Sequence, residues 1–215
     1  MLFPFSQVFE IICLIIAIRF LQPVKSPFWR SFRWFMLITV LVEVTGHILR
    51  YYDINNHGIY NLYMPVEALY KYYVLYWLCR DYFKVEYWLI PFAGIFFILY
   101  LYESIDKNFS QYSYITNSVM SVSMVIVCCL YYYYFLKKEE YVNIYEHAPF
   151  WIITALFFFY LGSTACNVFW YYLTTIYKTQ HIPVRFIIFA LLNFIMYGCW
   201  SYSFICKYRQ TISSS

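Results

Sequence analysis

Charged residues are scarce in this sequence. Asp, Glu, Lys and Arg make up 12% of its 215 residues, whereas soluble domains carry about 25%. Hydrophobic residues reach 63% and the mean hydropathy is +0.57, which excludes a water-soluble monomer. Five glycines and seven prolines, without a biased polar tract, exclude a collagen-like or disordered chain. The net charge of +4 is too small to indicate nucleic-acid binding, so we expect no nucleic-acid partner.

Long polar connectors are also missing, and apolar runs fill the chain. A helix that crosses a bilayer needs about 20 mainly apolar residues. Runs near this length occupy residues 3–21, 32–49, 59–79, 87–102, 115–136, 150–176 and 182–206. The first run lacks a basic leader and a small-residue cleavage site, so we interpret it as a retained helix. The sequence therefore predicts one all-α, polytopic domain over residues 1–215, with seven transmembrane helices surrounded by the lipid bilayer.

The distribution of positive charge predicts the orientation of these helices. The loops after the first, third and fifth runs and the C-terminal tail hold nine Lys and Arg residues, and the opposite side holds four. Because Lys and Arg are enriched in cytoplasmic loops, we expect the N-terminus outside and the C-terminus in the cytoplasm. We expect a multi-pass protein of the cell inner membrane.

Patterns for catalysis and for metal binding are absent from the sequence. It contains no His-Glu-x-x-His, no Gly-x-Ser-x-Gly and no glycine-rich phosphate loop. The seven cysteines lie within or at the edges of apolar runs, where they are typical of small buried residues rather than disulfides or thiolate ligands. We therefore expect no enzyme activity, no cofactor and no bound metal.

Ionisable residues within the apolar runs are the informative ones, because each costs a few kcal/mol there and usually faces a partner or a cavity. The second run carries Glu43 and His47 and ends at Arg50. These positions are spaced i, i+4 and i+7, which places them along one face of a helix. The third run carries Glu67 and Lys71 at i, i+4, a spacing that allows an ion pair within the helix.

The depths of three carboxylates coincide. At 1.5 Å per residue, Glu10, Glu43 and Glu67 each lie about 10–12 Å from the outer end of their runs. Asn167 and Asn193 lie at about 13–17 Å by the same rise. If these faces converge, they form an outward-opening polar pocket for a small ligand or a cation, with His47 one turn above the carboxylates and Lys71 one turn below.

A second interpretation of the same residues is equally simple. Glu67 with Lys71, and Glu43 with His47 or Arg50, form mutually satisfied polar pairs between packed helices. Pro65 fits both interpretations, because a proline frees a backbone carbonyl, either for the pocket or at a packing kink. The many Tyr and Phe side chains are interpreted as lipid-facing and interfacial residues.

Two segments, VEVTGHILRYYDINNHGIYNLYMPVEALYKYY and HAPFWIITALFFFYLGS, carry a resemblance. They resemble an uncharacterised family of seven-helix membrane proteins of about 220 residues from Bacteroidota. The positions that carry the resemblance are Glu43, Gly46, Asn55, Asn56, Tyr60, Asn61, Glu67, Phe150, Trp151 and Ile152. The resemblance implies the seven-helix fold and emphasises Glu43 and Glu67, and it implies no activity.

Two functions follow from the predicted pocket, and an intramembrane enzyme that uses a metal ion is a third alternative, which the missing catalytic motifs disfavour. The first is a membrane sensor or signalling module that reports to a cytoplasmic protein partner through residues 80–86, residues 137–146 and the tail. The second is an ion channel, a transporter or a membrane effector, for example the membrane accessory protein of a CRISPR or other antiviral system. The sequence favours the sensor, because the fourth and fifth runs contain no charged residue that would continue a path inward.

Overall fold

The computed structural model describes residues 5–106, 111, 113–138 and 142–213. Within these residues the chain is helical and contains no strand, so the prediction of an all-α protein is confirmed. The eight helices are α1 (Phe5–Leu21), α2 (Pro27–Tyr51), α3 (His57–Cys79), α4 (Glu86–Asp106), α5 (Tyr114–Lys137), α6 (Ala148–Val168), α7 (Trp170–Gln180) and α8 (Val184–Ser213).

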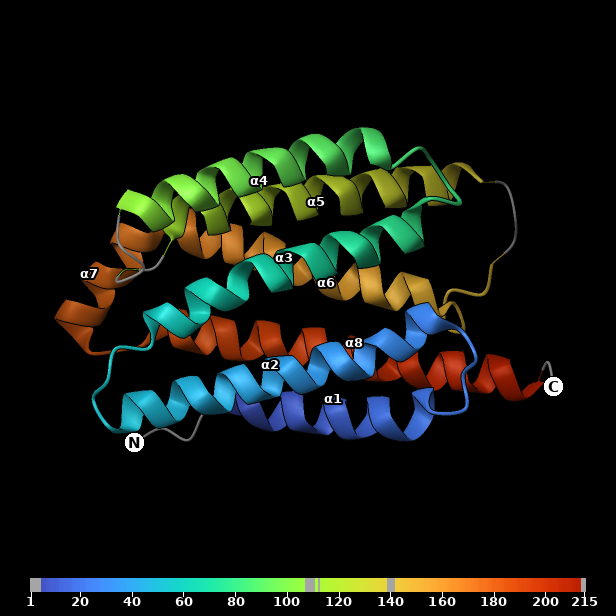
Figure 1. Ribbon diagram of the computed structural model, residues 1–215, viewed down its shortest axis with the longest axis horizontal. Coiled ribbons are helices and arrows are strands. Elements are labelled where there is room, and N and C mark those ends of the chain that lie inside the picture. Colours follow the sequence, from blue (N-terminus) through green and yellow to red (C-terminus); the bar gives the residue numbers. More distant parts are fainter. Residues whose placement is uncertain (1–4, 107–110, 112, 139–141, 214–215) are drawn as a thin grey trace.

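Seven of the helices are long and run side by side in alternating directions, and α7 lies across one end of the bundle (Figure 1). We call this end the α7 end. The connections from α2 to α3 and from α7 to α8 lie there, and α1 starts on that side, whereas α8 finishes at the opposite end (Figure 1).

Five helices are long and apolar enough to cross a membrane, namely α2, α4, α5, α6 and α8. Isoleucines and leucines on the outer surface of the bundle support this assignment, because Ile90, Ile98 and Leu136 are each about 70–77% exposed. Apolar side chains that face outward are expected where lipid replaces water. The protein is therefore a multi-pass membrane protein. The two other long helices are α1, which has 17 residues, and α3, whose apolar sequence is interrupted by Glu67 and Lys71.

The sixth apolar run differs from its prediction. The sequence predicted one helix over residues 150–176, but the structure ends α6 at Val168 and starts α7 after Phe169. The 21 residues of α6 already extend about 32 Å, enough for a hydrocarbon core of about 30 Å. No residue of α7 is buried, so this segment follows the surface of the bundle and does not prolong the span.

Pro65 lies inside α3 and lacks the amide that would bond to the carbonyl of Asn61. The hydroxyl of Tyr100, on α4, donates to that carbonyl at 3.1 Å. The carbonyl freed by the proline is therefore used for packing between α3 and α4. Of the two interpretations of Pro65, the structure supports the packing kink.

An aromatic cluster fills the bundle between its middle and the end opposite α7. It consists of Phe32, Phe35, Tyr70, Trp200 and Phe204. The rings of Phe35 and Tyr70 stack at 4.0 Å between centroids, and Phe32 contacts Trp200 and Phe204 edge to face at 5.4 and 5.3 Å. Such pairs contribute about 0.5–1.5 kcal/mol each beyond their burial, so this part of the bundle is tightly packed.

At the opposite end, α8 holds the first residue of α6 and the segment that precedes it. Ser203 donates to the carbonyl of Ala148 at 2.7 Å, and Gln210 donates to the carbonyl of Glu146 at 2.7 Å. The hydroxyl of Tyr202 donates to the carbonyl of Tyr145 at 3.1 Å. These bonds attach the second half of α8 to the start of α6 and to the residues just before it.

Candidate ligand cavity

A cavity of about 470 Å³ lies within the bundle toward the α7 end. It separates α3, which packs on α2, α4 and α5, from α8, which packs on α1 and α6. The side chains that line it are Glu10, Phe35, Thr39, Glu43, Arg50, Asn56, His57, Tyr60, Tyr63, Met64, Glu67, Lys71, Tyr114, Asn117, Met120, Phe159, Tyr160, Ser163, Arg185, Phe189, Asn193, Met196, Tyr197 and Trp200. Arg50 and His57 are exposed at the α7 end, so the cavity reaches the surface there.

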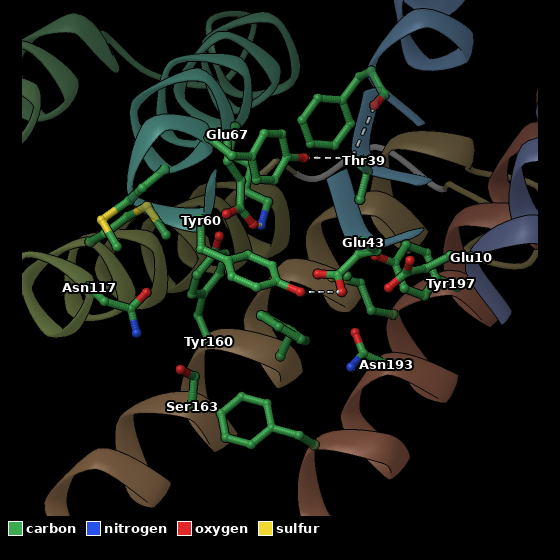
Figure 2. A pocket seen from close by; sticks show the side chains of 18 of the residues that line it. Glu10, Thr39, Glu43, Tyr60, Glu67, Asn117, Tyr160, Ser163, Asn193 and Tyr197 are labelled. Atoms are coloured by element: carbon green, nitrogen blue, oxygen red, sulfur yellow. Dashed lines mark hydrogen bonds and ion pairs between the residues drawn. The ribbon is translucent and has the colours of Figure 1, made fainter. Parts of the chain in front are cut away.

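The three predicted carboxylates all line this cavity. Glu10 comes from α1, Glu43 from α2 and Glu67 from α3, and their side chains turn toward the same space (Figure 2). The hydroxyl of Tyr60 donates to Glu43 Oε2 at 3.1 Å. Glu67 Oε1 accepts a hydrogen bond from Lys71 Nζ. The cavity wall therefore carries three acidic groups and one buried ammonium group.

Lys71 is only 2% exposed and is held from two directions. Its ammonium group pairs with Glu67 on the next turn of α3 and lies 4.9 Å from the ring centroid of Tyr160 and 5.5 Å from that of Phe159. An aromatic face attracts a desolvated cation by about 2 kcal/mol. The ion pair that the i, i+4 spacing suggested is therefore present, and α6 completes it with two rings.

Glu10 differs from the other two carboxylates. Its side chain is 4% exposed, and its Oε2 atom has no hydrogen-bond partner among the described residues. A buried oxygen that lacks a donor costs about 1–3 kcal/mol, and more for a charged group. Glu10 is therefore a lining residue with one side-chain oxygen that lacks a donor.

Two buried donors on the cavity wall also have no partner within the described part of the chain. They are Trp200 Nε1 at the floor and Arg185 Nε near the α7 end. With Glu10 Oε2 they make one acceptor and two donors around a single space. Unsatisfied buried polar atoms are rare in native proteins and call for a specific explanation.

Gly46 shapes the wall next to Glu43. The Tyr60 ring lies so close to the backbone of α2 that a Cβ atom at position 46 would overlap the phenol. The missing side chain allows Tyr60 to cross from α3 to Glu43, as Figure 2 shows. Asn56, just before α3, donates to the carbonyl of Gly46 at 3.1 Å and closes the same corner.

His47 was predicted to join the pocket, but the structure places it on the exposed surface. The inward face of α2 is defined by Thr39, Glu43, Gly46 and Arg50. At 100° per residue, His47 is rotated by about 70° from the centre of that face. His47 does lie one turn from Glu43 along α2. The residues that face the cavity, however, extend around the helix from Glu43 in the direction opposite to His47.

Asn167 was also predicted to join the pocket and does not line it. It lies one turn beyond Ser163 on α6, and its side-chain amide donates to the hydroxyl of Ser118 on α5 at 3.3 Å. This bond fits the interpretation of polar pairs between helices. Asn193, on α8, does line the cavity.

Aromatic side chains form much of the cavity wall, and sequence reasoning missed them. Tyr63, Phe159, Tyr197 and Trp200 were interpreted with all other rings as lipid-facing or interfacial. A helical signal was available, because residues four positions on either side of Asn193 share its face. Phe189 and Tyr197 occupy these two positions, and both line the cavity.

The potential metal-binding side chains of the described residues are not clustered. Among the described residues, no three His, Cys, Asp or Glu side chains lie close enough together to hold one. All seven cysteines are free thiols.

Comparison of the chain with protein-family models, with curated proteins and with solved structures finds no match. The resemblance to the seven-helix family therefore stays a prediction.

Proposed function

We propose that this protein is a membrane sensor that binds a small ligand in its intramembrane cavity and performs no catalysis. In this proposal seven helices cross the cell inner membrane, the N-terminus and the α7 end lie outside, and the C-terminus lies in the cytoplasm. The observation that carries the proposal is Glu10, a buried carboxyl group with an unpartnered oxygen on a cavity of about 470 Å³. A bound ligand that donates a hydrogen bond would satisfy it.

The path from the cavity to the cytoplasmic side runs along α8 in this proposal. Tyr197 and Trp200 line the cavity. Farther along the same helix, Ser203 and Gln210 hold the start of α6 and the residue Glu146 before it. A continuous helix moves largely as one body, so a change in the position of Trp200 reaches these bonds. A protein partner that contacts residues 142–147 would detect the change.

The packing below the cavity favours a sensor over a conduit. Phe35 and Trp200 form its floor, and both belong to the aromatic cluster, whose stacked rings occupy the route toward the opposite end. A channel or transporter would require this cluster to separate. We expect liposomes that contain the protein to release ions no faster than protein-free liposomes, and a protein-dependent flux would favour the conduit.

Ligand-induced stabilisation provides the first test. The full chain, purified in an uncharged detergent, is heated with a panel of small amines, alcohols and sugars, and the unfolding midpoint is recorded. A ligand that binds the folded state raises the midpoint, and the increase grows with the logarithm of its concentration once that concentration exceeds the dissociation constant. We expect a stabilising compound with a donor group, and Glu10→Gln to reduce its affinity at least about tenfold, since a charged hydrogen bond contributes about 1.5–3 kcal/mol.

Glu103→Gln is the matched control. Glu103 is also a buried carboxylate, 1% exposed, but its Oε2 atom accepts from the backbone and hydroxyl of Thr116 on α5, away from the cavity lining. This variant shifts the starting midpoint and leaves the ligand-induced increase unchanged. If Glu10→Gln and Glu103→Gln affect the increase equally, the proposed role of the cavity is wrong.

A further inference from the structure

A second hollow adjoins the cavity. It is a groove of about 510 Å³ between α7 and α8, lined mainly by apolar and aromatic side chains such as Leu173, Val184 and Phe186. Arg50, Arg185 and Phe189 line both the groove and the cavity. The two hollows therefore meet at a shared wall that carries two arginines.

The chemistry changes in order along this route. The inner cavity presents the carboxyl groups of Glu10 and Glu43, the shared wall presents guanidinium groups, and the groove presents an apolar surface. A molecule that matches all three regions has a positive group, then a negative group, then an apolar chain. Charge complementarity of this kind determines which partner a binding surface accepts.

The surroundings of Arg185 favour the binding of an anion. Its guanidinium lies over the ring of Trp170 at 4.3 Å and 5.2 Å from the ring centroid of Phe189. Its Nε donor is buried without a hydrogen-bond partner among the residues that the structure describes. An aromatic ring uses none of the N–H donors of a guanidinium, so these donors can bind an oxyanion, and phosphate is a ligand that such a fork binds with two bonds.

We propose that the ligand is a phospholipid with an ammonium headgroup, which reaches the cavity sideways from the bilayer between α7 and α8. The ammonium donates to Glu10, the phosphate binds Arg185 and Arg50, and the acyl chains lie in the groove. This inference rests on the proposed function, because it names the ligand of the same cavity.

Each part of the lipid is complementary to a separate feature of the structure. The unpartnered oxygen of Glu10 needs a donor, which an ammonium group supplies three times over. The buried Nε of Arg185 needs an acceptor, which the phosphate supplies. The groove between α7 and α8 opens beside lipid-exposed side chains such as Phe186 and Tyr177. A soluble amine leaves the arginines and the groove unused.

Short-chain lipids test the proposal on the purified full chain. The unfolding midpoint is titrated with dihexanoyl phosphatidylethanolamine, with dihexanoyl phosphatidylglycerol and with phosphoethanolamine, which lacks acyl chains. We expect stabilisation by phosphatidylethanolamine at concentrations at least about tenfold lower than for either other compound, because each of them lacks one of the matched groups.

Two pairs of variants assign the stabilisation to the site. Glu10→Gln and Arg185→Gln should each weaken it at least about tenfold, while Glu103→Gln and Arg80→Gln should leave it unchanged. Arg80 is a matched control because its guanidinium also lies over a tryptophan, Trp77, at 3.5 Å, outside both hollows. Equal losses in all four variants would overturn the assignment.

The remaining outcomes separate this inference from the proposed function. Equal binding of phosphatidylglycerol overturns the role of the ammonium group, and equal binding of phosphoethanolamine overturns the role of the groove. If no lipid stabilises the protein while a compound of the soluble panel does so through Glu10, the lipid is wrong and the sensor stands. If no compound of either set binds, both proposals fail.

Discussion

At Gly46 the absence of a side chain lets the Tyr60 ring rest on the backbone of α2 and reach Glu43. Gly46→Ala would therefore force the ring away, and overpacking of this kind costs about 1–3 kcal/mol. The higher helix propensity of alanine offsets about 0.5–1 kcal/mol of this cost. We therefore expect Gly46→Ala to lower the free energy of unfolding by up to about 2 kcal/mol, measured by titration of detergent-solubilised protein with a denaturing detergent.

Gly198→Ala is the control for this substitution. Gly198 lies inside α8 and no atom approaches within 4 Å of an added Cβ, so alanine should raise the free energy of unfolding by about 0.5–1 kcal/mol through its higher helix propensity. Opposite signs for the two variants are the expected result. A stabilised Gly46→Ala protein would show that Tyr60 is not held as described.

His147 precedes α6 at the end opposite α7, and its Nε2 lies 3.3 Å from the hydroxyl of Tyr82. Burial lowers the pKa of His147 below its ordinary value of 6.5, because a charged imidazole is poorly solvated there. The unfolded chain therefore binds a proton first as the pH falls. The contribution of the neutral imidazole to stability is complete above pH 6.5 and is lost as the pH falls from there through the lower folded value.

This predicts a specific pH dependence. The free energy of unfolding of the wild type should fall between pH 7 and pH 5 relative to that of His147→Phe, whose ring can keep the contact with Phe135. The difference between the two curves isolates His147 from the carboxyl groups. Parallel curves for the two proteins would contradict the prediction.

A site residue can be predicted from the sequence when its type is unusual in its surroundings. A carboxylate within an apolar run is costly wherever it points, so Glu10, Glu43 and Glu67 could be found without a structure. The direction of His47 depends on how α2 is rotated, which one helix alone does not determine. Tyr197 could have been found from its spacing of four residues from Asn193, whereas Trp200 carried no such signal, because 26% of the chain is aromatic and most of these rings serve packing.

Among the helices, α3 depends on a bond from its neighbour. Pro65 leaves the carbonyl of Asn61 without its helical partner, and Tyr100 donates to it from α4. Tyr100→Phe should lower the free energy of unfolding by about 1 kcal/mol, the net value of one buried hydrogen bond. In a Pro65→Ala background the restored amide can donate to Asn61, so we expect Tyr100→Phe to have a smaller effect there.

A double-mutant cycle measures this coupling. The four proteins are the wild type, the two single variants and the double variant, each unfolded under the same conditions. Additive effects would show that the Tyr100 hydroxyl and Pro65 act independently, contrary to the geometry.

The ends of the helices are harder to predict from the sequence than the helices themselves. The fourth apolar run ends at residue 102, just before Glu103, yet α4 continues to Asp106. Glu103 is buried there because Thr116, on α5, donates to it twice. The existence of each long helix could be predicted from hydropathy, whereas its end depended on a partner in another helix.

For the whole molecule, the arrangement of the helices predicts that the connections alternate between the two sides of the membrane. Ile54, in the connection between α2 and α3, is 54% exposed, and Asp81, between α3 and α4, has a side chain 78% exposed. In a background without native cysteines, Ile54→Cys should react with a membrane-impermeant maleimide in intact cells. Asp81→Cys should react only after permeabilisation. Labelling of both in intact cells would show that α3 does not cross the membrane.

The length of α8 gives small movements a large effect. Its 30 residues extend about 45 Å, and the part from Phe189 to Gln210 extends about 32 Å. A rotation of about 5° around Phe189 would displace Gln210 by about 3 Å, as much as the length of its bond to the Glu146 carbonyl, 2.7 Å. In the proposed sensor, a small rotation of α8 at the bound ligand would therefore break a contact at the other end of the bundle.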